Sequence, residues 1–204
     1  MTEHNQKNFT NLNKKLYLVQ DIYTLIYCSF ILPISLYNIL YNTNIITWKI
    51  DLFSYVYFIT TGIINLINKE YDFLLHHLVC LGIIWSGNYN NNLEYYIWVS
   101  NCYLSEFSNI FLSYKNILRY QKDKISNYKI INNINNFMFI LSYFIIRICW
   151  IIPITILFSL KNYKNLIYNK FILINISMMI YLNIYWLNKI FKKIKKDFLS
   201  IDKK

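Results

Sequence analysis

The sequence predicts an all-α membrane protein, a bundle of six transmembrane helices with both termini in the cytoplasm. Three observations lead to this prediction. Of the 204 residues, 56% are hydrophobic and only 15% are charged, whereas about a quarter of a soluble domain is charged. Apolar runs of membrane-spanning length recur along the chain, and about 20 mostly apolar residues cross a hydrocarbon core of ~30 Å. Lysine and arginine also gather on one side of the resulting topology.

The apolar runs define one membrane domain, with no sign of a soluble module or an internal repeat. We divide the chain into a cytoplasmic segment 1–16, a six-helix domain 17–190 and a basic cytoplasmic tail 191–204. The third span is short, about 15 residues, and would rise only about 22 Å at 1.5 Å per residue. The spans are expected at about 17–41, 52–68, 72–86, 95–114, 137–160 and 166–190.

Orientation follows from the placement of basic residues. With the N-terminus inside, sixteen of the 21 Lys and Arg residues fall in cytoplasmic segments and four fall in the opposite loops, and Arg147 lies within a span. This asymmetry is typical of an N-in, C-in protein. The net charge of +11 lies in juxtamembrane loops, where attraction to anionic headgroups accounts for it. We therefore expect membrane lipids as partners and no nucleic acid.

The sequence offers no recognisable metal or cofactor site. Each of the four cysteines falls in a different apolar segment and none has metal-type spacing, which favours packing roles. Two adjacent histidines cannot easily bind one metal from a regular helix, unlike a pair four residues apart. No glycine-rich phosphate loop is present. The cysteines are Cys28, Cys80, Cys102 and Cys149.

Ionisable side chains in the predicted third span are the first candidates for function, because each costs about 2.5–3.5 kcal/mol near the bilayer centre. Asp72 and His76 are four residues apart and share a helix face, so the carboxylate could orient the imidazole and favour its protonated form. His77 points about 100° away, and the pair could line two sides of one cavity. The alternative is that both histidines are hydrogen-bonded packing residues.

A polar stripe in the predicted fourth span should also face the bundle interior. Its Glu106 needs a partner, and Arg147 or a histidine is the natural candidate. A structural Glu106–Arg147 ion pair and a substrate-binding role both remain open. Asn183 of the sixth span lies a turn deeper than the interfacial Trp186 and should face the bundle. The stripe consists of Cys102, Glu106, Asn109 and Ser113.

Four blocks, in order along the chain, carry a resemblance to a known family. They resemble the TLC (TRAM–LAG1–CLN8) domain family from the first span to the end of the sixth, which implies a six-helix bundle and location in the endoplasmic reticulum. The blocks are Asp72-x-x-x-His76-His77, 104–112, 144–148 and Leu182-Asn183-x-x-Trp186-x-x-Lys189-Ile190.

The best-known TLC proteins, the ceramide synthases, join a fatty acyl-CoA to a sphingoid base. The resemblance implies that His76 or His77 would act as general base or carry the acyl group, with Asp72 orienting it. Ceramide synthases also carry a downstream HD…D element, whereas no histidine follows His77 here. This departure favours the small TLC-domain branch, whose members are linked to membrane lipid composition or trafficking.

Three hypotheses follow, and the sequence does not decide whether the protein is an enzyme. The first is a lipid-binding or lipid-homeostasis protein without a cofactor. The second is an acyl-CoA-dependent lipid N-acyltransferase, with Asp72, His76 and His77 catalytic and acyl-CoA as co-substrate. The third is a cargo or trafficking receptor that depends on the basic tail. The expected substrate-binding residues are Glu106, Asn109, Arg147 and Asn183.

Overall fold

All regular structure in the described part of the chain is helical. The computed structural model describes residues 3–43, 47–90, 93–162 and 170–201, and no strand occurs in these ranges. The elements are α1 (Glu3–Tyr41), α2 (Thr47–Ile67), α3 (Tyr71–Asn90), α4 (Leu93–Tyr103), α5 (Glu106–Tyr120), η1 (Lys122–Lys124), α6 (Tyr128–Ser142), η2 (Tyr143–Ile151), α7 (Ile152–Lys161) and α9 (Lys170–Ile201).

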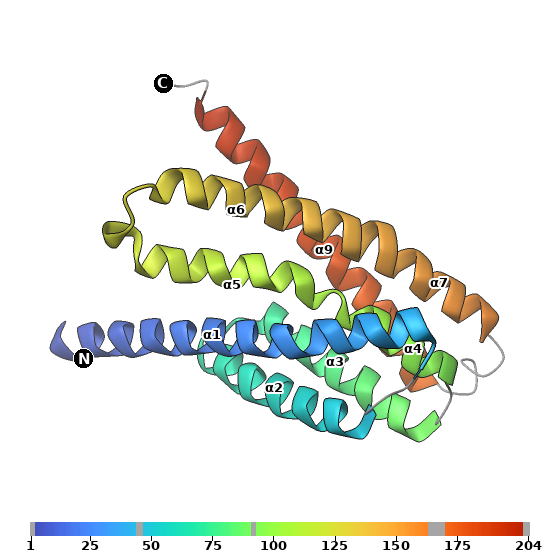
Figure 1. The fold of residues 1–204 in the computed structure, drawn as a ribbon. Coiled ribbons are helices and arrows are strands. Elements are labelled where there is room, and N and C mark those ends of the chain that lie inside the picture. The colour runs from blue at the N-terminus through green and yellow to red at the C-terminus, as the bar shows by residue number, and fades with distance from the viewer. Residues whose placement is uncertain (1–2, 44–46, 91–92, 163–169, 202–204) are drawn as a thin grey trace.

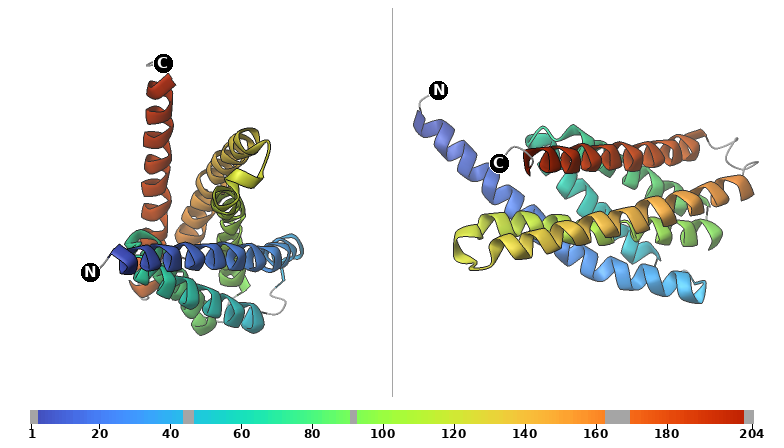
Figure 2. Two further views of the ribbon diagram at one scale, coloured as in Figure 1. Left: turned by 90° about the vertical axis from the view of Figure 1, so that its left-hand side faces the viewer. Right: turned by 90° about the horizontal axis from the view of Figure 1, so that it is seen from above.

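The helices run back and forth between two ends of the bundle (Figures 1 and 2). One end, here called the terminal end, holds the start of α1, the α2–α3 turn, η1 and the end of α9. The opposite end, here called the far end, holds the connections after α1, α3 and α7 (Figure 1). Helix α1 packs against α2, α4 and α5, while α3 packs against α2 and α9. The core therefore lies between α1 and α3 and the helices that pack against them, α2, α4, α5 and α9.

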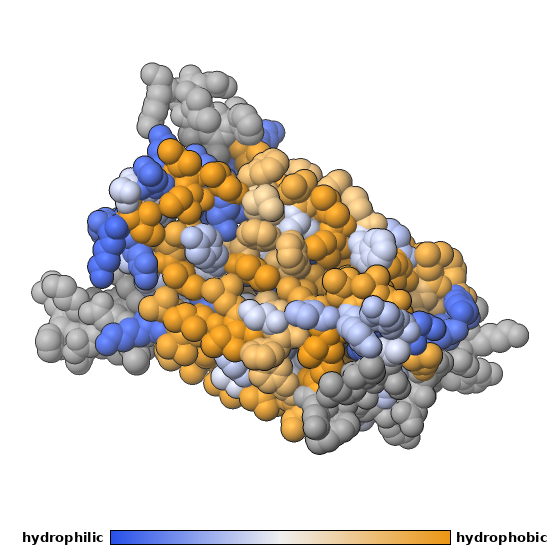
Figure 3. Space-filling view, viewed as in Figure 1, coloured by the Kyte–Doolittle hydropathy of each residue, from blue (hydrophilic) through white to orange (hydrophobic). Residues whose placement is uncertain are grey.

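The surface and the interior have the polarity expected of a membrane protein. Among the described residues, four helical stretches are long and apolar enough to cross a membrane, and the apolar stretch Tyr71–Ser86 of α3 is shorter. Large apolar side chains cover much of the face seen in Figure 3, and hydrophilic residues gather near the terminal end. Buried polar residues are numerous inside, including Ser54, Thr61 and Asn65, each with no exposed surface. The four stretches are Lys15–Tyr41, Ile50–Ile67, Tyr128–Lys161 and Lys170–Lys195.

The sequence predicts one helix over 95–114, but the structure breaks it between α4 and α5. The amides of Leu104 and Ser105 donate to the carbonyl oxygens of Asn101 and Cys102, at 3.1 and 3.0 Å. These bonds join residues three apart instead of four, so the chain winds more tightly than an α-helix. The break turns the start of α5, including Glu106, toward the middle of the bundle.

Helices α6 and α7 are joined without interruption through the π-helical segment η2, which lies within the predicted span 137–160. Pro153 follows at the start of α7. Proline cannot donate the α-helical hydrogen bond to residue 149, and its ring crowds that carbonyl. Wider π turns just before the proline relieve this conflict, and such segments often occur at functional sites. Arg147 lies at the centre of η2.

The polar ends of the chain are more helical than the sequence suggests. Helix α1 already begins at Glu3, inside the predicted segment 1–16, and α9 continues to Ile201, through most of the predicted tail 191–204. No glycine or proline follows Pro153, so nothing in the sequence stops α9 at the membrane edge. Residues 166–169 of the predicted sixth span and residues 202–204 lie outside the described ranges.

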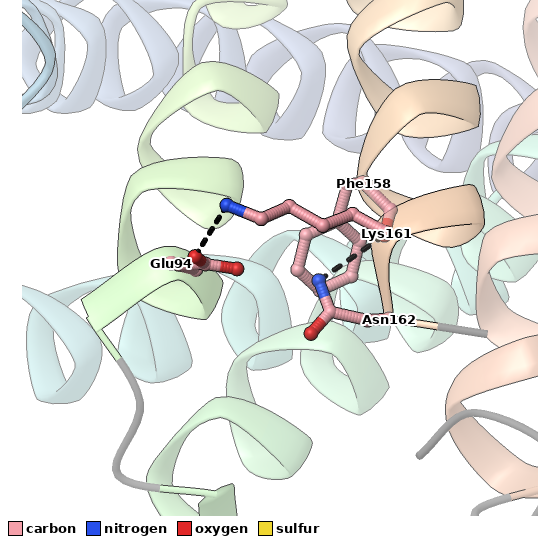
Figure 4. Close-up of polar contacts among 4 residues, drawn as sticks. All are labelled: Glu94, Phe158, Lys161 and Asn162. Atoms are coloured by element: carbon pink, nitrogen blue, oxygen red, sulfur yellow. Dashed lines mark hydrogen bonds and ion pairs between the residues drawn. The ribbon is translucent and has the colours of Figure 1, made fainter. Parts of the chain in front are cut away.

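The far end is closed by paired side chains. Trp98 stacks on Phe158 with ring centroids 4.8 Å apart, and its indole nitrogen donates to Thr155 at 3.1 Å. Nearer the surface, Lys161 forms an ion pair with Glu94 at 2.6 Å (Figure 4). The hydrogen bond from Lys161 lowers the pKa of the exposed Glu94 carboxyl below its ordinary value.

Candidate functional site

A cavity of about 360 Å³ opens into the terminal half of the bundle. Helices α1, α2, α3, α5, α6, η2 and α9 all contribute to its wall. This volume is within the range of small-molecule binding pockets. The wall combines aromatic side chains with many polar ones. The polar and charged lining residues outside the aromatic set are Gln20, Asp21, Thr24, Asn65, Glu70, His76, His77, Asn109, Ser113, Asn116, Arg147 and Lys189.

His77 is held by helix α2. Its Nδ1 lies 3.3 Å from the Thr61 hydroxyl and 3.2 Å from the Asn65 amide nitrogen. Asn65 in turn accepts a hydrogen bond from Gln20 of α1 at 3.0 Å. These contacts fix the ring plane and connect it to α1, while Nε2 has no partner among the described residues.

His76 contacts a sulfur atom and an aromatic ring and makes weaker polar contacts than His77. Its two ring nitrogens lie 3.8 and 3.7 Å from the Cys80 sulfur, and Trp186 packs edge-on against the ring with centroids 5.1 Å apart. The side chain is 8% exposed. The two histidines thus both line the cavity, as the sequence suggested they could, and no hydrogen bond joins either ring to a carboxylate within the described part of the chain.

The structure gives Asp72 other partners than His76, the contact that the sequence suggested as possible. The Asp72 carboxylate instead accepts from Lys189 at 2.7 Å and from the Trp186 indole at 3.4 Å, both on α9. A full ammonium charge makes a shorter and stronger hydrogen bond than a neutral donor, and α9 packs directly against α3. Sequence spacing alone showed that Asp72 and His76 share a face, but not that α9 would supply a better partner.

Four of the predicted site residues meet in a buried polar cluster, which we call the Arg147 cluster (Glu106, Ser108, Asn109, Arg147 and Asn183). Arg147 donates from Nε to Ser108 at 2.9 Å, from Nη1 to Asn183 at 3.4 Å and from Nη2 to Asn109 at 3.0 Å. Asn109 donates from its amide to Glu106 at 2.7 Å. Asn109 therefore bridges the two charges, which form no direct ion pair. Both Glu106 and Arg147 are 2% exposed.

A second, smaller space of about 30 Å³ adjoins the cavity and shares His76 and Arg147 with it. Glu106 and Asn183 line this small space and not the larger cavity. Its volume is about that of one water molecule. The large cavity is therefore lined by four of the predicted site residues, His76, His77, Asn109 and Arg147. Glu106 and Asn183 line only the small space, and Asp72 lines neither.

The sequence reasoning missed two carboxylates of the cavity. Asp21 accepts from the Asn116 amide at 3.1 Å, and Glu70 accepts from the Tyr17 hydroxyl at 3.0 Å. Burial raises the pKa of the Glu70 carboxyl above its ordinary value of 4.5; the Tyr17 hydrogen bond lowers it, and the charge of Asp72 raises it. The sequence feature that could have identified them is their position at the ends of apolar spans. An ionised side chain there is costly unless it has a partner or a function.

The sequence reasoning also did not identify Trp186 as a site residue, because its position near the end of a span suggested an anchor at the membrane interface. The residues Asn183, Trp186 and Lys189 recur every three positions on α9 and so share one face. That face meets Arg147, His76 and Asp72. Tyr143 and Trp186 also flank the Arg147 guanidinium, with ring centroids 5.3 and 5.8 Å from its carbon.

Within the described ranges, no group of three or more His, Cys, Asp and Glu side chains could hold a metal ion. Comparison with known families gives one finding: the family model described as TLC domain matches residues 18–192. No curated protein and no solved structure matches the chain. The matched range includes every residue of the cavity wall except Tyr17.

Proposed function

The chain belongs to the TLC-domain family, and from this premise we propose that it is an integral membrane protein that binds a membrane lipid and acts in lipid homeostasis. The observation that carries the proposal is the cavity, whose polar wall lies behind an apolar outer surface. A lipid can enter such a space with its headgroup at the terminal end and its chains toward the apolar side. The lipid-homeostasis role and the endoplasmic reticulum membrane are proposed from the family.

We further propose six membrane passes, with the terminal end in the cytoplasm. The passes are α1, α2, α3, α4 with α5, α6 with η2 and α7, and α9. Their alternating directions put the start of α1 and the end of α9 at one end of the bundle (Figure 1). The basic residues of η1 and of the end of α9 also lie there, which agrees with the positive-inside rule.

The test is to fill the cavity without replacing any of its charged residues. Ser113 is 4% exposed and lines the cavity, so Ser113→Phe should occupy the space a lipid would take. Ser177 on α9 is exposed and bonds only to its own helix, so Ser177→Phe is the matched control. Native mass spectrometry of the purified proteins should find lipid on the wild type and on Ser177→Phe, but little on Ser113→Phe. Equal lipid on both variants would contradict the proposal.

An acyl-CoA-dependent N-acyltransferase is the second candidate, because His76 and His77 both line the cavity. Its test is product formation from labelled acyl-CoA and sphingoid base in membranes of cells without their own ceramide synthases. A His76→Ala/His77→Ala double variant is the control. Product from the wild type alone would make the protein an enzyme. No product from well-folded protein would leave lipid binding as the function.

A cargo or trafficking receptor is the weakest of the three candidates. It predicts that deletion of 192–204 abolishes function in cells while the histidine double variant keeps it. Lipid binding predicts the reverse order of sensitivity, because the cavity contains both histidines and none of the deleted residues.

A further inference from the structure

The charges around the cavity do not cancel. Lys189 is neutralised by Asp72 at 2.7 Å, and Arg147 is compensated by Glu106 through Asn109. The two remaining carboxylates, Asp21 and Glu70, have no cationic partner in the part of the chain that the structure describes.

Both carboxylates line the cavity, and the Tyr17 hydroxyl that donates to Glu70 at 3.0 Å belongs to the residue one helical turn before Asp21 on α1. Asp21 is buried and Glu70 is half-buried, and carboxylates withdrawn from water are costly unless a cation or a proton neutralises them. The cavity therefore has a local deficit of positive charge.

Two buried acceptor atoms in the same region also have no hydrogen-bond donor among the described residues. Asp21 is 7% exposed, and no described residue binds its Oδ2, although Asn116 donates to Oδ1 and Ser113 lies beside the carboxylate. The neighbouring Gln20 lines the cavity, and its Oε1 is also buried without a partner. Such orphaned acceptors cost free energy that a bound N–H or O–H donor would recover.

We infer that the cavity binds the primary ammonium group of an ethanolamine-type phospholipid headgroup, held by Asp21 and Glu70. This inference rests on the proposed lipid-binding function. A primary ammonium brings the missing charge and up to three N–H donors, whereas a trimethylammonium group brings charge but no donor. A serine headgroup adds a carboxylate that Asp21 and Glu70 repel.

The phosphate of such a lipid has donors available in the same cavity. An ammonium side chain has three N–H donors and a guanidinium has five. Lys189 commits one N–H to Asp72, and Arg147 commits three to the Arg147 cluster. The remaining donors favour a zwitterionic headgroup over a free long-chain amine, which has no phosphate to accept them.

The experiment uses the wild-type chain and a methylation series. The purified full-length protein is equilibrated with an equimolar mixture of phosphatidylethanolamine, its N-monomethyl and N,N-dimethyl forms, and phosphatidylcholine, all with the same acyl chains. The retained lipid is then quantified by mass spectrometry. We expect about tenfold enrichment of ethanolamine over choline, decreasing with each methyl group, as loss of a charge-assisted hydrogen bond predicts. Equal retention across the series would overturn the inference.

Variants localise the effect. Asp21→Asn/Glu70→Gln keeps the shape and the Asn116 contact, so it should still retain lipid with a preference of about twofold or less. Asp123→Asn removes an exposed carboxylate in η1 at the same end of the bundle and should keep the full preference. Undiminished preference in the double variant would place the selection elsewhere and overturn the inference.

Two further comparisons distinguish failure of the headgroup assignment from failure of the proposed lipid-binding function. In pairwise competition, long-chain amine or phosphatidylserine retained in preference to phosphatidylethanolamine would overturn the headgroup assignment. Wild-type protein that retains lipid without preference would defeat this inference alone. Wild-type protein that retains no lipid, with no difference from Ser113→Phe, would defeat the proposed function together with it.

Discussion

The terminal end and the far end of the bundle contain similar polar side chains and use them differently. At the far end, Ser86 and Tyr95 hydroxyls lie 2.6 Å apart, and Trp98 donates to Thr155. The space beside the buried Asp51 is only about 20 Å³. At the terminal end, the cavity is about 360 Å³ and contains two carboxylates, Asp21 and Glu70, that form no ion pair with any residue the structure describes.

The comparison teaches that polarity inside a membrane protein does not by itself mark a site. Where polar groups satisfy one another, as around Tyr95 and Trp98, they hold helices together and leave no room. Where acceptors and charges have no partner among the described residues and lie beside open volume, as around Asp21 and Glu70, we propose that a ligand supplies the partner. The following predictions test this division, beginning with the largest expected effect.

Arg147→Met should cause the largest loss of stability, about 3–5 kcal/mol, because it leaves Glu106 charged and uncompensated in the protein interior. Adding Glu106→Gln should recover most of the loss, since the remaining groups are neutral. Denaturant unfolding in detergent measures both variants against the wild type. A double variant as unstable as the single one would show that Arg147 does not act by compensating Glu106.

Tyr95→Phe should destabilise the far end by about 2 kcal/mol. The Tyr95 hydroxyl contacts Ser86 at 2.6 Å and the Ile83 carbonyl oxygen at 2.8 Å, and each buried hydrogen bond contributes about 1 kcal/mol. Because this end lies outside the cavity, lipid retention at equal folded fraction should not change. A changed lipid preference would show that the far end also affects lipid binding, which would contradict the proposed difference between the two ends.

Substitution of two glycines tests how closely α2, α3 and α9 pack, because one site is crowded and the other is open. A Cβ on Gly82 would lie 2.6 Å from the Asn175 Oδ1, whereas a Cβ on Gly62 would find its nearest neighbour at 3.7 Å. Gly82→Ala should therefore cost about 1 kcal/mol, because the buried Asn175 has to shift. Gly62→Ala should be neutral or stabilise by about 0.5 kcal/mol through helix propensity. Thermal unfolding of both variants tests the order.

The smallest effects should come from Glu70 and Glu94, with opposite dependence on pH. The pKa of Glu70 is raised by burial, so its contribution to the stability of the lipid-free protein is present below its unfolded pKa and lost as pH rises through the folded pKa. The pKa of Glu94 is lowered by Lys161, so its contribution is present above its unfolded pKa and lost as pH falls through the folded pKa.

Melting temperatures of Glu70→Gln and Glu94→Gln between neutral pH and pH of about 3 measure these two contributions, because this range extends below the ordinary pKa of a glutamate. Relative to the wild type, Glu70→Gln should be more stable at neutral pH and should lose that advantage on acidification. Glu94→Gln should be slightly less stable at neutral pH and should converge on the wild type in acid. The same sign for both would show that the two ends do not differ electrostatically.

Much of the fold could be predicted from composition and periodicity. The all-α membrane class is confirmed in the described ranges, because long apolar runs have few alternatives. The break before Glu106 and the π-helical turns around Arg147 could not be predicted in the same way. They depend on three-residue hydrogen bonds at 104–105 and on the conflict at Pro153, which hydrophobic patterning does not record.

The candidate site was predictable in part. The inward stripe placed Glu106 and Asn109 on the face that meets the bundle interior, because helix spacing fixes which residues share a face, and Arg147 was one of the partners considered for Glu106; the bridging position of Asn109 was not predicted. The partner of Asp72 was not predictable, since it comes from α9, more than a hundred residues away. Asp21 and Glu70 were not identified as a pair, because they lie on separate segments that only the folded bundle brings together.

The most direct test of the lipid-binding cavity is photocrosslinking. A phosphatidylethanolamine with a photoreactive group in the first half of its acyl chain would be bound to the purified protein and activated, and the labelled peptides mapped by mass spectrometry. The account predicts labelling of α5 around Asn109 and Leu112, which line the cavity, and loss of that labelling in Ser113→Phe. Labelling confined to the exposed outer faces, such as Ile134 and Phe137 of α6, and unchanged in Ser113→Phe, would contradict it.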